Sequence, residues 1–179
     1  MPRNHLKVPV GPADHLQGNG NAKVTLVEYG DYECAYCGQA YPIVKQVQMR
    51  MRDQLRFVFR NFPLAEAHPN ATAAAEMAEA SAQQEKFWDM HDMLFEHQDA
   101  LGPGDLLNYA RELRLDLGRL EAALQDGAIA ARVRSDFMSG VRSGVNGTPS
   151  FFINDIHFDG DWTNVDEFVA SLSTPSARG

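Results

Sequence analysis

Both cysteines of the chain lie in one short stretch, residues 30–38, with the sequence GDYECAYCG. Cys34 and Cys37 are three positions apart, which is close to one turn of a helix. At the start of a helix, free backbone amides and the helix dipole stabilise the thiolate form of the first cysteine. The second cysteine can then close a disulfide with it or resolve a mixed disulfide. The pair therefore predicts thiol-disulfide exchange, with Cys34 attacking and Cys37 resolving.

Two other uses of this pair remain open. A zinc site would need two further ligands, and these would have to be histidines, but His91 and His97 are six positions apart rather than three to five. Two inert buried thiols are the second alternative. A structural disulfide is not typical here, because a bridge across so short a loop stabilises little.

The elements around the pair can be predicted from hydrophobic patterning. Residues 22–30 form a β-branched, apolar run that predicts a buried strand, and residues 55–62 alternate as a second strand. Between them, apolar residues recur every three or four positions from Cys37 to about Arg52, which predicts a helix. The cysteines therefore lie at a strand-to-helix junction of a βαβ unit with parallel strands. We expect residues 1–21 to be an irregular lead-in.

The middle of the chain changes character. Between Pro63 and about Arg142 the sequence predicts a block of helices: one over residues 70–85, an aromatic one over FWDMHDMLF, one after residues 102–105, one near 117–124, and one carrying Ile129, Val133, Phe137 and Val141. After it, SFFIN and IHFDG predict a hairpin linked by Asn154 and Asp155. We expect Thr163 to cap a final helix.

Two stretches in this order resemble the thioredoxin superfamily: VTLVEYGDYECAYCGQAYP and, much later, GVNGTPSFFIN. The long helical block between them resembles the DsbA-like branch of disulfide oxidoreductases. The resemblance covers residues 22–172 and implies an α/β, thioredoxin-like fold with a large helical insertion. We expect residues 1–62 and 144–179 to form the core and residues 63–143 the inserted subdomain.

The resemblance also implies roles for individual residues. Thr148-Pro149 matches the cis-proline site, where the backbone of the preceding residue pairs with an extended substrate segment. Glu28 matches a buried acid beneath the cysteine pair, where a raised pKa would let it exchange a proton with the resolving thiol; the alternative is a glutamate that faces water. Arg56 or Arg60 would be the basic neighbour of Glu28. No cofactor is implied beyond the redox-active Cys34-Cys37 disulfide, and no metal.

The residues next to Cys34 set its expected reactivity. Strongly oxidising relatives carry a histidine where this chain has Tyr36, and Asp31 and Glu33 add negative charge. We therefore expect an intermediate reduction potential. We expect Tyr32 and Tyr36 to be exposed contacts for apolar, unfolded substrate segments. His68, Asn70 and His91 show no link to chemistry.

Composition limits the partners. Sixteen Lys and Arg against 24 Asp and Glu give a formal charge of −8, which makes nucleic acid an improbable partner. No apolar run reaches the roughly 20 residues of a membrane span. If Met1 is the natural start, the lack of a signal segment predicts a cytoplasmic location; if a leader precedes it, a periplasmic or extracellular one.

These observations support two hypotheses about function. The first is a protein disulfide oxidoreductase that acts on protein, peptide or small-molecule thiols and disulfides, with a separate redox partner. The alternative is a non-catalytic, thioredoxin-like binding module that holds a partner protein or a metal through Cys34 and Cys37. Catalysis that is lost with Cys34 would distinguish the first from the second.

Overall fold

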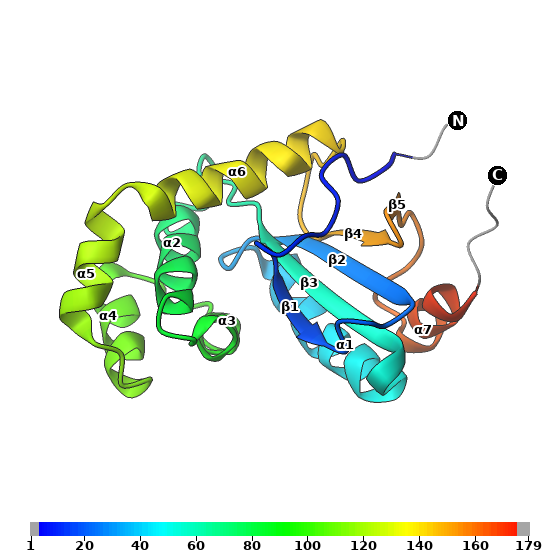
Figure 1. Ribbon diagram of the computed structural model, residues 1–179, viewed down its shortest axis with the longest axis horizontal. Coiled ribbons are helices and arrows are strands. Elements are labelled where there is room, and N and C mark those ends of the chain that lie inside the picture. Colours follow the sequence, from blue (N-terminus) through cyan, green and yellow to red (C-terminus); the bar gives the residue numbers. More distant parts are fainter. Residues whose placement is uncertain (1–3, 175–179) are drawn as a thin grey trace. The chain divides into compact units, whose positions relative to one another are not determined.

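The computed structural model describes residues 4–174 of the 179-residue chain. They form two compact units (Figure 1). The sheet unit contains the chain up to Gly30, Gln39–Arg60 and the chain from Ser139. The helical unit contains Asp31–Gly38 and Asn61–Met138. The cysteine segment therefore groups with the helical unit.

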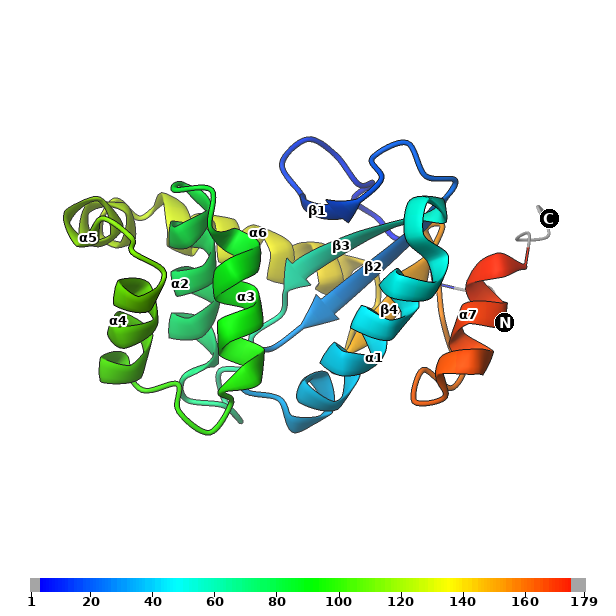
Figure 2. The same ribbon diagram turned by 90° about the horizontal axis from the view of Figure 1, so that it is seen from below.

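A five-stranded mixed sheet forms the centre of the sheet unit. Its strands are β1 (His15–Gly18), β2 (Val24–Gly30), β3 (Leu55–Asn61), β4 (Ser150–Ile153) and β5 (Ile156–His157), in the order β1-β3-β2-β4-β5. The pairs β1/β3, β2/β4 and β4/β5 are antiparallel. The neighbours β2 and β3 point the same way and are joined through α1 (Ala35–Met51), which confirms the predicted βαβ unit (Figure 2).

Helices cover one face of this sheet. From Gln39 onward α1 belongs to the sheet unit, and a short 3₁₀ turn, Arg52–Gln54, leads from it into β3. The last helix, α7 (Val165–Ser173), lies on the same side as α1 (Figures 1 and 2). Phe168 of α7 is fully buried and packs edge-on against Phe151 of β4, with ring centroids 5.1 Å apart. Aromatic packing of this kind anchors α7 on the sheet.

The N-cap of α7 is not the residue predicted from the sequence. Asn164, and not Thr163, caps the helix: its side-chain oxygen accepts hydrogen bonds from the amides of Asp166 and Glu167. The Thr163 hydroxyl instead donates to Asp161. Both residue types are good caps, so the local sequence could not separate the two positions.

The predicted hairpin between β4 and β5 is confirmed. Its link consists of Asn154 and Asp155, which both adopt positive φ, at 46° and 69°. Two successive left-handed residues are what a type I′ turn requires. The Asn154 side chain also accepts a hydrogen bond from the amide of Thr25 at 2.8 Å, which holds the turn against the start of β2.

The prediction of an irregular lead-in over residues 1–21 is wrong for β1. His15 pairs with Phe59 and Gly18 with Arg56, so that β1 extends the sheet beyond β3. These four residues, HLQG, show no apolar alternation, and their strand conformation comes from pairing with β3. Residues 1–3 lie outside the described part of the chain.

The helical unit consists of α2 (Ala71–Ala82), α3 (Phe87–Glu96), α4 (Pro103–Glu112), α5 (Leu117–Gln125) and the part of α6 (Ala128–Arg142) up to Met138. All five helices match predicted ones. Helix α2 contacts α3, α4 and α5, and its buried alanines allow close approach by the neighbouring helices. Among residues 4–174, no helix is both long and apolar enough to cross a membrane.

Candidate active site

Cys34 directly precedes the first residue of α1, and Cys37 lies in its first turn. The carbonyl of Cys34 accepts the first helical hydrogen bond, from the amide of Gly38 at 3.0 Å. Cys34 is therefore the N-cap residue, next to amides that have no partner earlier in the helix. Both side chains are buried, with 5% of Cys34 and 0% of Cys37 exposed. This placement favours a thiolate at Cys34.

Asp31 contacts both cysteines through its backbone. Its amide donates a hydrogen bond to Cys37 Sγ at 3.4 Å, and its carbonyl accepts one from the amide of Cys34 at 3.1 Å. Its carboxylate is fully buried and accepts three more, from the amides of Glu33 and Leu64 and from Nδ1 of His68 at 2.7 Å. The Asp31 charge is thus compensated by three N–H donors.

The second acid of the motif is also held from the helical unit. Glu33 accepts hydrogen bonds from the amide of Asn70 at 2.6 Å and from its side-chain nitrogen at 2.8 Å. Both bonds involve a charged acceptor and two donors of one residue, a geometry that fixes the carboxylate. Asp31 and Glu33 therefore tie the segment before Cys34 to residues 64–70.

Gln98 holds the same segment from the chain that follows α3. Its side-chain nitrogen donates to the carbonyls of Tyr32 at 2.8 Å and Cys34 at 2.9 Å. Gly38 permits this approach, because a Cβ at that position would lie 2.6 Å from Cδ of Gln98. The Cys34 carbonyl therefore accepts hydrogen bonds from both Gly38 of α1 and Gln98.

The two tyrosines next to Cys34 differ in exposure. Tyr36 is 64% exposed, as predicted. The prediction that Tyr32 is exposed is wrong: it is 1% exposed, its hydroxyl lies 3.0 Å from Nδ1 of His91, and its ring packs against Phe95. A buried tyrosine of this kind packs its ring against apolar neighbours while its hydroxyl keeps a hydrogen-bonding partner. Tyr32 is therefore a packing residue, whereas the side chain of Tyr36 faces solvent.

His68 is the charged group that the helical unit contributes to this site. The hydrogen bond to Asp31 raises the pKa of His68 above its ordinary value, against a smaller lowering by partial burial. The negative charges of Asp31, Cys34 and Glu33 act in the same direction. The ring is one-quarter exposed, so it exchanges protons with solvent. The protonated imidazolium is therefore favoured next to the cysteine segment.

Three predicted site residues belong to the sheet unit. Glu28 is on β2, opposite Phe151 of β4, and only 3% of it is exposed, which confirms its burial and excludes a glutamate facing water. Thr148 and Pro149 directly precede β4, and the peptide bond between them is cis. Both are half-buried. They place a backbone segment at the start of a central strand.

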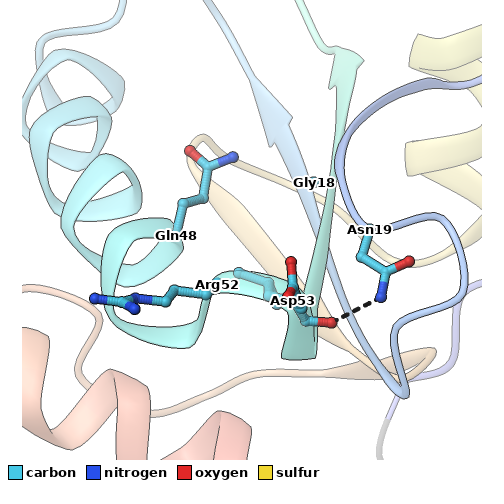
Figure 3. Close-up of a pocket in the computed structure, with 6 residues that line it drawn as sticks. Gly18, Asn19, Gln48, Arg52 and Asp53 are labelled. Atoms are coloured by element: carbon cyan, nitrogen blue, oxygen red, sulfur yellow. Dashed lines mark hydrogen bonds between the residues drawn. The ribbon is translucent and has the colours of Figure 1, made fainter.

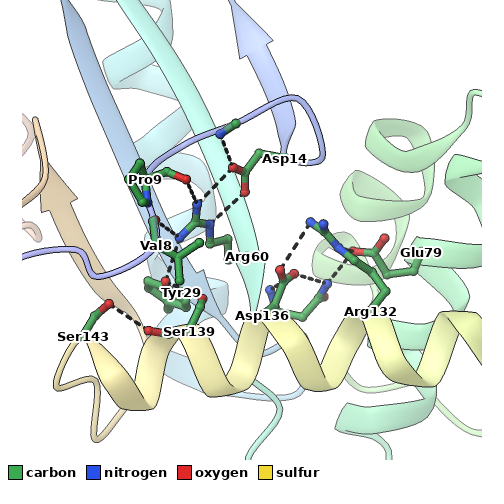
Figure 4. A network of polar contacts seen from close by, with 12 residues as sticks. Val8, Pro9, Asp14, Tyr29, Arg60, Glu79, Arg132, Asp136, Ser139 and Ser143 are labelled. Carbon is green, nitrogen blue, oxygen red and sulfur yellow. Dashed lines mark hydrogen bonds and ion pairs between the residues drawn. The ribbon is translucent and has the colours of Figure 1, made fainter.

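Both arginines of β3 donate hydrogen bonds to neighbouring groups, and Figure 4 shows the contacts of Arg60. Arg60 is 2% exposed and donates to both carboxylate oxygens of Asp14, at 2.8 and 3.0 Å, and to the Tyr29 hydroxyl at 2.9 Å. Burial alone would lower the pKa of Arg60, but the hydrogen bonds to Asp14 and Tyr29 outweigh it and raise the pKa. Arg56 donates to the Thr25 hydroxyl at 2.6 Å.

A second buried polar cluster lies in the helical unit (Figure 4). Asp136 of α6 accepts from the amide and side chain of Asn61, and Arg132 lies 3.3 Å from its other oxygen. Burial raises the pKa of Asp136 to about 6, and the charge of nearby Glu79 adds to this, whereas Arg132 opposes it. Desolvation therefore outweighs the single arginine shared by two carboxylates.

A pocket of about 480 Å³ in the sheet unit does not contain the predicted site. It is lined by Gly18, Asn19, Gln48, Arg52, Asp53 and Leu55, none of which is a cysteine or histidine (Figure 3). Asn19 donates to the backbone carbonyl of Asp53 at 3.0 Å, and Arg52 points away from both (Figure 3). Over residues 4–174, no three His, Cys, Asp or Glu side chains gather as a metal site would require.

Three residues of the site were not found from the sequence: His68, Asn70 and Gln98. They lie 37, 37 and 64 to 66 positions from their partners and have no periodic relation to the cysteines. One signal was present, since His68 and Asn70 flank Pro69 in a turn directly before a helix. Polar residues in such a turn have side chains free to bind a neighbouring loop.

Known protein families and curated proteins match most of this chain. A family model described as Thioredoxin matches residues 11–172. The chain is 45% identical over 173 residues to a Na(+)/H(+) antiporter NhaA 3 of Salinispora tropica and 40% identical over 175 residues to an NhaA of Herminiimonas arsenicoxydans. These alignments cover 96% and 97% of this chain but only 26% and 27% of the antiporters. The chain thus spans about a quarter of the length of these curated relatives.

Solved structures share the fold. A thioredoxin-like oxidoreductase from Silicibacter pomeroyi is 28% identical with a TM-score of 0.78, and the match covers 90% of this chain and 92% of that one. BdbD from Bacillus subtilis, in its oxidised form, is 25% identical with a TM-score of 0.78, covering 89% and 90%. Both match nearly the whole of each chain, including the helical insertion. The DsbA-like form of the thioredoxin fold, predicted from the sequence, is therefore confirmed.

Proposed function

Because the chain belongs to the thioredoxin family, we propose that it is a thiol-disulfide oxidoreductase that uses Cys34 and Cys37 as a redox-active pair on protein or peptide substrates. The observation that carries the proposal is the position of the two sulfurs. Cys34 caps the N-terminus of α1, and Cys37, one turn later, accepts a hydrogen bond from the amide of Asp31 at 3.4 Å. Both features favour thiolates over thiols.

The proposed reaction has two exchange steps. The Cys34 thiolate attacks one sulfur of a substrate disulfide, so that a mixed disulfide forms and the other substrate sulfur leaves as a thiolate that takes up a proton. The Cys37 thiolate then attacks Cys34 Sγ, releases the first substrate sulfur, and leaves Cys34 and Cys37 joined. Two electrons pass from the protein to the substrate. The reverse sequence oxidises a substrate dithiol.

Other residues have supporting roles in this proposal. Glu28 is the buried acid that would exchange a proton with the resolving thiol. The backbone of Thr148, held by the cis bond to Pro149, would pair with an extended substrate segment. Tyr36 would contact apolar side chains of the substrate. A separate redox partner would restore the Cys34-Cys37 pair after each turnover.

Reduction of insulin disulfides by dithiothreitol, with and without the protein, tests this function. We expect Cys34→Ser to lower the catalysed rate at least about a hundredfold, because the attacking sulfur is removed. When reduced Cys37→Ser is incubated with insulin without dithiothreitol, we expect it to accumulate a mixed disulfide with the substrate, visible as a mass increase that added dithiothreitol reverses. Met49→Ser, at an exposed position of the same helix, is the matched control and keeps the wild-type rate.

The result that would contradict the proposal is equally definite. A wild-type protein that neither accelerates insulin reduction nor equilibrates its cysteines with glutathione is not an oxidoreductase of this type. A Cys34→Ser variant that retains the wild-type rate would show that the catalysed exchange does not use Cys34 and Cys37.

A further inference from the structure

One residue links both cysteines to a titratable group that the chemistry above does not use. Asp31 contacts Cys34 and Cys37 through its backbone, and its buried carboxylate accepts a hydrogen bond from His68 at 2.7 Å. Asp31 shows 0% exposure and His68 25%. The Asp31 carboxylate is thus shielded from solvent, whereas the ring of its partner His68 is partly exposed to it.

The charge balance of this segment depends on His68. The neighbouring carboxylate, Glu33, accepts hydrogen bonds from two neutral donors of Asn70. The Asp31 carboxylate accepts hydrogen bonds from two neutral backbone amides, those of Glu33 and Leu64. His68 is the partner of these acids that carries a titratable positive charge. Its charge offsets that of Asp31 when the ring is protonated, and this offset disappears when the ring loses its proton.

We propose that His68 is a positioning residue that acts through Asp31 on the Cys34-Cys37 pair and makes its redox equilibrium depend on pH near neutrality. This rests on the proposed function. A protonated His68 stabilises a thiolate at Cys34, and therefore the reduced protein. As the pH rises and His68 becomes neutral, the reduced form loses this stabilisation and the disulfide form gains relative to it. The charge that Tyr36 does not supply between the cysteines thus comes from the helical unit.

The groups that act on the His68 ring support this direction. They are Asp31, Glu33 and Cys34, all negative in their ionised forms, and all raise the pKa of His68. Electrostatic coupling is reciprocal. If the Cys34 thiolate stabilises the protonated form of His68, then protonated His68 stabilises the Cys34 thiolate by the same free energy. Because the ring is partly exposed, we expect a modest effect.

The test compares wild type with His68→Gln and His68→Arg, each equilibrated with reduced and oxidised glutathione at several pH values between about 5 and 8. Glutamine can still donate a hydrogen bond to Asp31 but carries no charge, whereas arginine keeps the charge at every pH. At the acid end of this range, the equilibrium constant for oxidation of the protein by oxidised glutathione should be about two- to fivefold higher in His68→Gln than in wild type. His68→Arg should keep the wild-type acid value. Neither variant should show the wild-type change with pH.

His97→Gln is the matched control. His97 belongs to the same unit, is exposed, and donates to the carbonyl of Met93 at 2.9 Å. We expect its equilibrium to follow wild type at every pH. A His68→Gln variant that shows the full wild-type change with pH would overturn the proposal, as would a His68→Arg variant that behaves like His68→Gln.

A measurement on the wild-type protein decides the question if the variants do not fold. The proton resonances of the His68 ring titrate at a midpoint that should be higher in the reduced protein than in the disulfide form or in Cys34→Ser. Equal midpoints in all three would overturn the proposal. A protein that does not exchange with glutathione would overturn the proposed function instead, and the comparison with Cys34→Ser would still decide the role of His68.

Discussion

Gly38 shows how a single missing side chain organises the cysteine segment. The space that its Cβ would occupy is filled by the amide of Gln98, which donates to the carbonyls of Tyr32 and Cys34. The backbone of Gly38 is not in the left-handed region, so close approach and not conformation explains the glycine. A residue that reads as an ordinary small helix residue is thus a contact site for a distant loop.

Gly38→Ala is expected to destabilise the protein by about 1–3 kcal/mol, because the new methyl displaces Gln98 and its two hydrogen bonds are lost. Gln98→Ala loses the same bonds and should cost a similar amount. The double variant should cost little more than either single one, since both remove one interaction. The measurement is the free energy of unfolding in urea.

Gly104→Ala is the control for this cycle, since a Cβ at Gly104 has no neighbour within 4 Å. It lies in the first turn of α4, where alanine should be neutral or slightly stabilising. Strictly additive effects of Gly38→Ala and Gln98→Ala would show that the two residues do not share one interaction.

At the scale of elements, a buried ion pair joins β3 to the segment that precedes β1. Arg60 of β3 binds Asp14 with two hydrogen bonds and also donates to the carbonyls of Val8 and Pro9, at 2.9 and 3.2 Å (Figure 4). Arg60 therefore contributes both to the position of this segment and to the pairing of β1 with β3.

Arg60→Met is expected to cost about 3–5 kcal/mol in the free energy of unfolding, because the Asp14 carboxylate, 8% exposed, loses its charged partner. Asp14→Asn combined with Arg60→Met should recover part of that loss. Arg56→Met, on the same strand, removes an arginine that donates to a hydroxyl and a carbonyl and should cost about 1 kcal/mol.

Hydrogen exchange of the β1 amides is a second test of the Arg60–Asp14 ion pair. In Arg60→Met, we expect exchange to accelerate in residues 15–18 more than in β2. Equal losses for Arg60→Met and Arg56→Met would contradict a special role of the buried pair.

At the scale of the whole molecule, regular patterning made most elements predictable. β2, α1, β3, the helices of the insertion and the β4-β5 hairpin follow from apolar periodicity and turn residues. β1 does not, because its strand conformation is imposed by β3. The cysteine pair follows from its spacing, whereas the cis bond after Thr148 is implied by the resemblance to the thioredoxin superfamily. His68, Asn70 and Gln98 follow from neither, because each acts through one or two long-range hydrogen bonds, which leave no repeating signal in the sequence.

Two of the groups with raised pKa values in the helical unit, Asp136 and His68, predict how stability depends on pH below the range in which tyrosine titrates. Asp136 keeps its proton up to about pH 6 in the folded protein but only to 3.8 when unfolded. The folded state therefore binds more protons in this window, and stability falls as the pH rises through it. His68 acts in the same direction at higher pH, since its stabilising charge is present below its ordinary pKa and is lost as the pH passes its raised value.

The free energy of unfolding in urea, measured from about pH 4 to 8, should therefore decrease as the pH rises, with up to about 3 kcal/mol from Asp136. Asp136→Asn should flatten the curve below about pH 6, because the amide cannot ionise but can still accept hydrogen bonds from Asn61. Asp126→Asn, at the exposed C-cap of α5, should leave the curve unchanged. If Asp136→Asn kept the full slope, the buried carboxylate of α6 would not be its source, and the shared arginine would compensate both Asp136 and Glu79 after all.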